Sequence, residues 1–394
     1  MVWELRSEGY FLMLSPSELS QLRAAAANHI EAVAELAQRI CEIPAPTGNE
    51  QARAQLVASL LRKRGYIPEI DAISNVYTRR GKRGNGPVLL LLAHTDTVFP
   101  QATPISIERD ADILRGPSIG DNSLSVAAMI STLDILDELG RETDADIVAV
   151  ADVGEEGLGN LLGARTAVER YREKLGAVIA IDGKLGRITH IAVGSKRWRI
   201  SVRGPGGHSY GAFGTPSAIH GLGRIIAAIA DLQVPREPKT TYNVGIIEGG
   251  TSVNTIASRA TALLDLRSID VASLDRVADQ VRAIVQQRAG PGLQTEIEVL
   301  GERPAGARSQ SDPLVQLAAE ALTWLGIEPK YEASSTDANV PISLNIPAVC
   351  IGITQVEQAH TLEEFVHVQP IGNGLAQLVR LCIEASTLIA AIRK

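Results

Sequence analysis

Short runs of consecutive apolar residues alternate along the chain with stretches that repeat at a helical period. Each run is bounded by Gly, Pro or polar residues, a pattern typical of strands buried on both faces. These runs are Val88–Ala93, Ile147–Asp152, Ala177–Ile181 and Ala348–Ile353. Helices are predicted at Ser17–Cys41, Asn49–Arg64, Ser123–Leu139 and Leu314–Leu325. The alternation predicts an α/β domain whose mixed, mostly parallel sheet is flanked by helices.

A different pattern occupies residues 194–303. Apolar and polar residues alternate there as they do in half-buried strands, at Lys196–Val202, Tyr242–Ile247, Ala260–Arg267 and Thr295–Val299. Helical periods occur at Pro216–Leu232 and Val271–Ala289. The order β-α-β-β-α-β predicts a ferredoxin-like α+β unit. Because the apolar strand at Ala348 returns to the first pattern, we expect residues 194–303 to be inserted into an α/β domain formed by residues 1–193 and 304–394.

Composition narrows the classes of function. The chain has 394 residues, enough for two domains, and its apolar (45%) and charged (21%) fractions are those of a soluble globular protein. Its net charge is -7 and only 4% of its residues are aromatic. Nucleic acids and anionic membranes bind basic faces, and single strands also need aromatic platforms, so we expect neither partner.

Cysteine usage and the chain's beginning bear on location. Cys41, Cys350 and Cys382 are far apart and form no CxxC pair, which favours a reducing compartment without a disulfide framework. We expect no apolar stretch to reach the ~18 residues that a membrane-spanning helix needs. The first residues, MVWELRSEGYFLML, lack the charge order and cleavage site of a signal peptide. The sequence therefore predicts a cytoplasmic protein.

Residues with acid, base or ligand chemistry follow each buried strand. His94 and Asp96 follow the first strand, Glu155 and Glu156 the second, Asp182 the third, and His360 a short loop after the last. Open α/β sheets bind ligands at the carboxyl ends of their strands. Asp121, at the turn into the Ser123–Leu139 helix, is a further candidate.

Each of these residues alone has a commoner explanation. A lone His at a strand end is usually a surface residue, a Glu-Glu pair a solvated helix start, and Asp121 a helix cap. The repeated order of buried strand and then acid or imidazole favours a metal site. Imidazole and carboxylate ligands without thiolate suit zinc, cobalt or manganese. A bridging Asp121 with two ligands for each metal would hold two divalent ions.

The order and spacing of these residues resemble a known family. The motifs are His94-Thr95-Asp96, Gly120-Asp121-Asn122, Gly154-Glu155-Glu156, a lone Asp182 and a late His360. They are similar to those of the dizinc exopeptidases and amidohydrolases, which include peptidase T, glutamate carboxypeptidase, aminoacylase and succinyl-diaminopimelate desuccinylase. Asn122-Ser123-Leu124 and Ser334–Asn339 are most similar to the peptidase T-like branch, although Ser replaces Gly in the second segment.

The resemblance assigns roles to the metal-site candidates. It implies that His94 and Asp182 bind one metal, that Glu156 and His360 bind the other, and that Asp121 bridges the two. Asp96 would orient the His94 ring. Glu155 would be the general base, which takes a proton from the attacking water and passes it to the leaving amine.

For the inserted unit the resemblance implies a lid and dimerisation domain. His208, in Gly206-Gly207-His208-Ser209, would donate a hydrogen bond to the oxyanion, and Asn254 and Arg267 would grip a substrate carboxylate. Taken alone, His208 in a Gly-rich loop is as well explained as a turn residue, and Arg267 as a surface charge. A homodimer is expected from the resemblance.

Three functions follow, in order of preference. The first is a two-metal aminopeptidase of short peptides, similar to a tripeptidase. The second is an amidohydrolase or carboxypeptidase that cleaves N-acyl or N-carbamoyl amino acids, and the third is an inactive binding protein on the same fold. A serine hydrolase is rejected because no GxSxG elbow is present. A nicotinamide enzyme is rejected because His94-Thr95-Asp96 stands where GxGxxG would be required.

Overall fold

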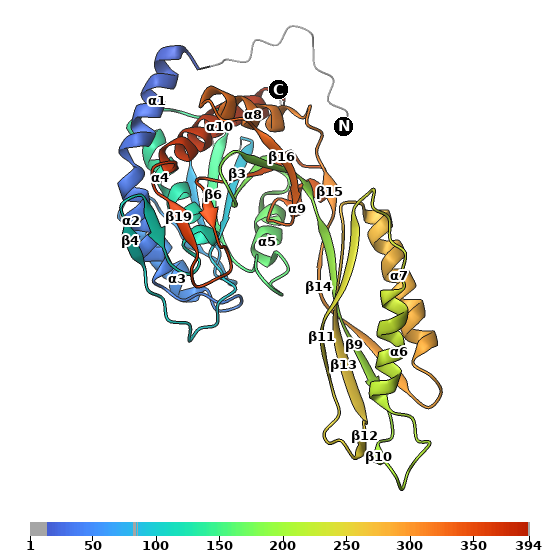
Figure 1. The fold of residues 1–394 in the computed structure, drawn as a ribbon. Helices are drawn as coiled ribbons and strands as arrows, with labels where there is room; N and C mark the ends of the chain where they lie inside the picture. Colours follow the sequence, from blue (N-terminus) through green and yellow to red (C-terminus); the bar gives the residue numbers. More distant parts are fainter. Residues whose placement is uncertain (1–13, 82–83, 85, 393–394) are drawn as a thin grey trace. The chain divides into compact units, whose positions relative to one another are not determined.

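The computed structural model describes residues 14–81, 84 and 86–392 and divides the chain into two compact units (Figure 1). The larger unit consists of Met1–His190 with Arg308–Lys394, and the smaller unit of Ile191–Ala307. The segment in which no signal peptide was recognised lies almost entirely outside the described residues.

The larger unit is built on one mixed sheet with the strand order β1-β2-β6-β3-β7-β17-β8, and β16 pairs with β8. The four central strands β6, β3, β7 and β17 are parallel, and β2 and β8 flank them antiparallel. The strands are β1 (Glu69–Ile70), β2 (Val76–Arg80), β3 (Val88–His94), β6 (Asp146–Asp152), β7 (Leu175–Ile181), β8 (Arg187–Ala192), β16 (Lys330–Ser334) and β17 (Ala348–Ile351). This sheet confirms the predicted α/β class, and the four central strands are the four apolar runs.

Helices cover both faces of this sheet (Figure 1). Alternate residues of β3, such as Leu89 and Leu91, join a core cluster with α4 and α10, whereas α5 packs on β3 and β6. Since both faces are covered, the strands have no polar side and read as continuous apolar runs. The helices are α1 (Pro16–Asn28), α2 (Ile30–Cys41), α3 (Gln51–Arg62), α4 (Leu124–Glu138), α5 (Leu162–Tyr171), α8 (Pro313–Trp324), α9 (Asn339–Ser343) and α10 (Ile371–Ile392).

The single helix predicted at Ser17–Cys41 is wrong, because the chain breaks at His29 into α1 and α2. Helix α1 packs mainly on α10, whereas α2 packs mainly on α4. The break lets each apolar face meet a different neighbour. Neither Gly nor Pro marks it, so the sequence carried no signal for it.

Helix α10 corrects another prediction, that no stretch is long enough to span a membrane. Its 22 residues pass that test by length and composition, but 72% of its apolar window is buried inside the unit. A buried core helix passes the same test, and α10 packs on α1, α8 and β3. It is therefore weak evidence for a membrane.

A small antiparallel sheet joins distant parts of the larger unit. Its order is β18-β19-β5-β4, and Phe365 in β19 pairs with Arg115 in β5. This pairing brings the loop after β18 next to the turn Ile119–Ser123, which begins α4. The strands are β4 (Glu108–Asp110), β5 (Ile113–Arg115), β18 (Val356–Glu357) and β19 (Phe365–His367).

The smaller unit has a four-stranded antiparallel sheet of order β11-β13-β9-β14, and α6 and α7 pack on β9 and β13. This is the predicted ferredoxin-like arrangement. Trp198 and Leu264 lie in its core. The elements are β9 (Gly194–Arg203), β10 (Gly207–His208), α6 (Ala218–Ala230), β11 (Thr240–Gly249), β12 (Thr255–Ile256), β13 (Arg259–Ser268), α7 (Val271–Arg288), β14 (Gln294–Arg303) and β15 (Gly306–Ala307).

Candidate metal centre

The carboxyl ends of three adjacent strands carry the first candidates. Strand β3 ends at His94, whose register partner in β6 is Asp152, and Asp182 follows the last residue of β7 directly. Because β3, β6 and β7 are parallel neighbours, the residues after them emerge at one edge of the sheet.

Asp121 lies between two imidazoles. Its Oδ1 is 3.2 Å from His94 Nε2, and its Oδ2 is 2.9 Å from His360 Nε2. His360 Nε2 is also 3.0 Å from Glu156 Oε1. His94, Asp121 and Glu156 each offer a ligand atom within 4.8 Å of the others. The turn Ile119–Ser123 thus presents one carboxylate oxygen to each side, the arrangement of a bridging ligand.

Asp182 stands slightly apart from this cluster. Its backbone amide donates to Ile351 O at 2.9 Å, which holds it at the end of β17 as well as β7. Within the described part of the chain its carboxylate makes no ion pair with His94 or His360. Burial raises the pKa of Asp182 to about 6, and the nearby charge of Asp121 adds to the rise. Asp182 therefore holds its proton more readily than an exposed Asp does.

The charges and donor atoms of the cluster fit a divalent metal ion. Hydrogen bonds to Asp121 and Glu156 raise the pKa of His360 to about 11, so the cluster is strongly negative. His94 Nε2 is buried and makes no hydrogen bond of acceptable geometry, although it faces Asp121. A buried nitrogen that converges with carboxylate oxygens is what Zn²⁺ and similar ions bind.

Asp96 connects His94 to the Glu155-Glu156 pair. Its Oδ1 accepts from the Glu155 amide at 3.0 Å, and its Oδ2 accepts from the Glu156 amide and the Thr47 hydroxyl, each at 2.8 Å. His94 Nδ1 lies 3.4 Å from Oδ1 and 3.2 Å from the Asp96 carbonyl oxygen. Burial raises the pKa of Asp96, but the His94 contact and these hydrogen bonds outweigh it and lower the pKa.

Glu155 is buried beside this cluster without belonging to it. Only 5% of its surface is exposed, and its amide is held by Asp96. Its charge acts on His94 and on Asp337. Of the Glu155-Glu156 pair, only Glu156 joins the described group of potential ligands.

Glu364 was not singled out from the sequence, yet it connects two segments of the cluster. The side chain is fully buried, and its Oε1 accepts from the amides of Gly120 at 2.7 Å and Asp121 at 2.8 Å. Its Oε2 accepts from the His360 amide at 3.3 Å. The only signal in the sequence is a Glu four residues after His360, and that spacing alone carries no prediction.

Two further buried acids lie close to His94. Burial raises the pKa of Asp152 to about 7, and burial together with the charge of Asp152 raises the pKa of Asp337 well above its usual range. Asp337 belongs to the Ser334–Asn339 segment, whereas nothing in the sequence separated Asp152 from the strand that it ends. The raised pKa values mean that this pair holds protons more readily than exposed Asp residues do, so it adds less negative charge beside His94 than two carboxylates would.

Comparisons with known proteins agree with this chemistry. Residues 192–292 match the model of the peptidase dimerisation domain, and residues 75–199 match that of peptidase family M28. The chain is 26% identical over 372 residues to a succinyl-diaminopimelate desuccinylase of Methylobacterium radiotolerans, which covers 86% of this chain and 93% of the relative. The chain is therefore similar to peptidases and amidohydrolases over most of its length.

Solved structures in this family share the fold. A tripeptidase of Staphylococcus aureus has a TM-score of 0.77 at 21% identity, and the match covers 92% of this chain and 99% of that chain. A dinuclear metal-binding peptidase of Bacillus subtilis has a TM-score of 0.67 at 17% identity, with coverage of 90% and 98%. The family resemblance and the fold class predicted from the sequence are both confirmed.

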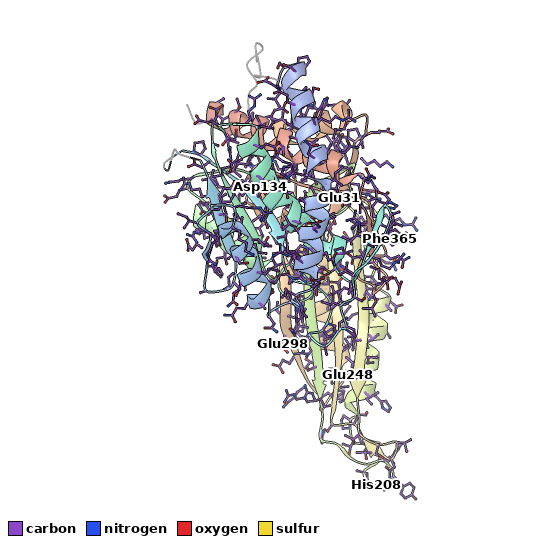
Figure 2. All side chains as sticks on the ribbon, turned by 90° about the vertical axis from the view of Figure 1, so that its left-hand side faces the viewer. Glu31, Asp134, His208, Glu248, Glu298 and Phe365 are labelled. Carbon is purple, nitrogen blue, oxygen red and sulfur yellow. The ribbon has the colours of Figure 1, made fainter. Side chains whose placement is uncertain are left out.

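In the dimerisation domain of this hydrolase, His208 and Asn254 lie at the same end. Figure 2 shows His208 at the tip, where β10 pairs with β12 and the Ser209 amide donates to the Asn254 carbonyl oxygen at 3.0 Å. His208 Nδ1 accepts from the amides of Tyr210 (3.3 Å) and Gly211 (3.2 Å). Because Nδ1 accepts, the neutral ring carries its hydrogen on Nε2, which is available as a donor.

Arg267 lies at the other end of the same sheet. It is eight residues along β13 from Arg259, about 27 Å at the usual rise of a strand. Its Nε donates to Asp265 Oδ2 at 2.7 Å. The structure therefore brings His208 and Asn254 together but does not bring Arg267 to them within one chain.

Proposed function

We propose that this hydrolase is a two-metal aminopeptidase that removes the N-terminal residue of short peptides, tripeptides in particular. The observation that supports the proposal best is the position of Asp121, with one carboxylate oxygen toward His94 and the other toward His360. Two ions that share a carboxylate act together on one water and one carbonyl group, which is what amide hydrolysis requires.

The ligands follow from the same contacts. We assign His94 and Asp182 to one ion, Glu156 and His360 to the other, and Asp121 to both. Zinc is the proposed metal, with cobalt or manganese as alternatives, because the donors are imidazole and carboxylate. When bound, such a pair of ions polarises the scissile carbonyl and makes a water molecule more acidic.

The remaining steps belong to side chains of the protein. Glu155 takes the proton of the attacking water and delivers it to the leaving amine, which needs a carboxylate near the ligands but outside them. Asp96 holds the Glu155 and Glu156 amides and the His94 ring in one arrangement. The Nε2 hydrogen of His208 is donated to the oxyanion as it forms.

The distance between His208 and Arg267 favours a homodimer. Since one chain holds them at opposite ends of a sheet, we propose that Asn254 of one copy acts with Arg267 of the other on one substrate carboxylate, while His208 beside Asn254 donates to the oxyanion. Strand β11 is an edge of the sheet and exposes Ile246 (51%) and Ile247 (58%), as an edge that pairs with a second copy would.

This interface has a direct test. Ile247→Lys is expected to convert a dimer into a monomer in light scattering, because it places a charge on the pairing edge. Val299→Lys is the matched control, since Val299 is similarly exposed (53%) on the opposite edge strand β14. A wild-type monomer, or a dimer that Ile247→Lys leaves intact, contradicts the proposal.

We also propose a cytoplasmic location and exclude nucleic acid and membrane from the partners. Cys41, Cys350 and Cys382 are all buried free thiols, as is usual in a reducing compartment. The net charge of -7 and the low aromatic content of 4% argue against a nucleic-acid partner.

A second candidate is an amidohydrolase or carboxypeptidase that cleaves N-acyl or N-carbamoyl amino acids. It is favoured by the desuccinylase relative, which is 26% identical, whereas the likeness to the tripeptidase rests on fold at 21% identity. An inactive binding protein is disfavoured, because Glu155 and all five proposed ligands are present.

Metal analysis of the purified protein and a substrate panel test the proposal. The panel contains tripeptides, dipeptides, N-acyl and N-carbamoyl amino acids, and we expect the highest kcat/KM with tripeptides. Glu155→Ala is expected to lower kcat about 100- to 10,000-fold, as loss of a general base does. Glu328→Ala, at an exposed position of the larger unit, is the control. Strong turnover of acyl amino acids without tripeptide turnover supports the second candidate, and full activity of Glu155→Ala excludes Glu155 as the base.

A further inference from the structure

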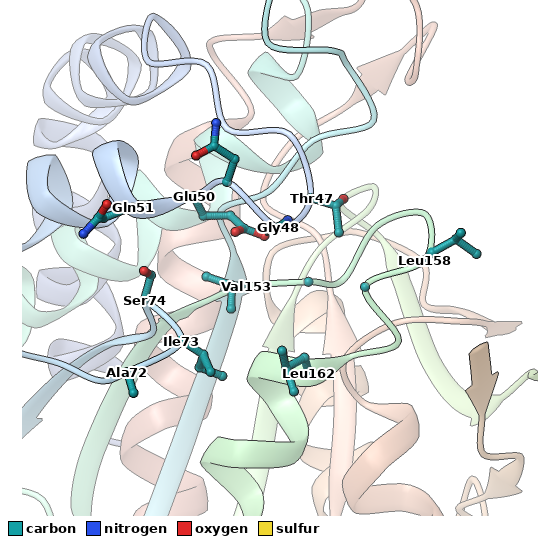
Figure 3. Close-up of a pocket in the computed structure, with 13 residues that line it drawn as sticks. Thr47, Gly48, Glu50, Gln51, Ala72, Ile73, Ser74, Val153, Leu158 and Leu162 are labelled. Atoms are coloured by element: carbon teal, nitrogen blue, oxygen red, sulfur yellow. Dashed lines mark hydrogen bonds between the residues drawn. The ribbon is translucent and has the colours of Figure 1, made fainter. Parts of the chain in front are cut away.

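A pocket of about 830 Å³ opens in the larger unit, beside the candidate metal centre (Figure 3). It lies between the amino end of α3, the segment of residues 72–74, and the loop that follows β6. Its volume is within the range of cavities that hold small-molecule ligands. None of the proposed metal ligands, nor Glu155, lines it.

The pocket and the metal cluster share a wall. Val153, Gly154 and Leu158 line the pocket, and the loop to which they belong carries Glu155 and Glu156. Thr47 lines the pocket too, while its hydroxyl donates to Asp96 at 2.8 Å. A group in this pocket therefore lies next to the loop that holds the proposed general base.

One side of the pocket is apolar and accessible. Leu158 is 55% exposed and Leu162 is 47% exposed, and both line the pocket together with Ile73 and Val153, all labelled in Figure 3. Exposed apolar side chains grouped in a concavity mark places where an apolar ligand group is desolvated. The grouping predicts that the occupant presents an aliphatic surface.

The charge of the lining excludes another class of occupant. Glu50 is only 4% exposed, and its carboxylate accepts from the Gly48 amide at 2.8 Å. The thirteen lining residues include no Lys, Arg or His. An acidic side chain in the pocket would face this buried carboxylate without a counter-ion, which is unfavourable.

We propose that this pocket is the specificity subsite for the substrate residue next to the cleaved bond. It takes a long aliphatic side chain, such as that of Leu or Met, and discriminates against Asp and Glu. This inference rests on the proposed function, because it assigns the side chain of the same amide substrate.

The test compares kcat/KM for Leu-Gly-Gly, Gly-Gly-Gly and Glu-Gly-Gly. In the wild-type enzyme we expect the order Leu, Gly, Glu. The double variant Leu158→Ser, Leu162→Ser is expected to lower the Leu/Gly ratio about tenfold, the usual size of discrimination by a small apolar contact. The ratio to Gly-Gly-Gly cancels any general change in activity, and circular dichroism shows whether the variant is folded. Glu50→Gln should raise the Glu/Gly ratio.

Ile67→Ser is the matched control, because Ile67 is an aliphatic residue of the same unit that is 94% exposed and does not line the pocket. It should leave all three ratios unchanged. If the double variant keeps the wild-type Leu/Gly ratio, or if Ile67→Ser shifts it as much, the subsite is refuted while the proposed function stands.

N-acetyl-leucine and N-acetyl-glycine separate this inference from the aminopeptidase proposal. If the enzyme cleaves these compounds and no tripeptide, the aminopeptidase proposal fails. The subsite is then tested with N-(4-methylpentanoyl)-glycine and N-acetyl-glycine, which carry the leucine and glycine side chains on the acyl side of the cleaved bond. A tenfold fall of the kcat/KM ratio of these two compounds in the double variant supports the subsite, and an unchanged ratio refutes it. Absence of turnover with every amide overturns both.

Discussion

Replacement of Glu364 should disturb the geometry of the metal centre while every proposed metal ligand is kept. The Glu364 carboxylate contacts the backbone, and not the side chains, of the proposed ligands. It accepts hydrogen bonds from the backbone amides of Gly120, Asp121 and His360. These hydrogen bonds therefore hold the backbone of two proposed metal ligands, Asp121 and His360, in place. We expect Glu364→Ala to loosen Asp121 and His360 together while every ligand stays present.

The magnitude follows from the three hydrogen bonds. An amide that donates to a charged group contributes roughly 1.5–3 kcal/mol, so the two short bonds contribute about 3–6 kcal/mol. The third is longer and ends on the half-exposed His360, so it adds little. Burial and the charge of Asp121 raise the pKa of Glu364 to about 7, so the carboxylate is itself unfavourable there. The net loss in the free energy of unfolding should be about 2–4 kcal/mol.

Metal affinity should fall by more than this stability loss explains. Replacement of a residue that forms hydrogen bonds to metal ligands typically lowers metal affinity about 10- to 100-fold. Competition with a chromophoric chelator measures the affinity, and urea unfolding of the metal-free protein measures stability. Glu384→Gln is the matched control, a buried Glu on α10 that pairs with Arg380. It should leave metal affinity unchanged, whatever its effect on stability. If Glu364→Ala binds metal as tightly as the wild type, the assigned role is wrong.

Two further predictions concern stability. Arg53 is fully buried and donates to the carbonyl oxygens of Ile43 and Thr95, so Arg53→Met should lower the free energy of unfolding by about 2–4 kcal/mol in urea titrations, whereas an unchanged midpoint would contradict this. Burial raises the pKa of Glu384, so the native state binds its proton more tightly than the unfolded state does. The stability difference between wild type and Glu384→Gln should therefore move against the wild type as pH rises above 4.5, the ordinary pKa of a Glu side chain, and a difference that is constant with pH would refute the reasoning.

The central strands could be predicted because a strand buried on both faces is a run of consecutive apolar residues, which is visible in the local sequence. The run at Val88 and its three counterparts became the four parallel strands at the middle of the sheet. The ferredoxin-like unit was predictable for a similar reason, since its strands alternate and its helices repeat. The break at His29 was not predictable, because it depends on which helices α1 and α2 meet.

The candidate site was predictable only in part. The order of strand ends pointed to His94, Glu156, Asp182 and His360, and the turn into the next helix to Asp121. The structure brings these side chains together except for Asp182, which stands slightly apart. Glu364 acts through backbone amides of residues far away in the sequence, which no local pattern reveals. The separation of Arg267 from His208 depends on the length of β13, and a motif does not encode that length.

The small sheet that pairs β5 with β19 also has a consequence for synthesis of the chain. His360 follows Asp121 by 239 residues, and in the folded protein the pairing of Phe365 with Arg115 lies next to the loop that carries His360. A nascent chain that has passed the first strands on the ribosome therefore carries His94 and Asp121 without their distant partner. We expect such a chain to have no hydrolase activity until β19 has emerged, so an unfinished molecule would not hydrolyse peptides around it.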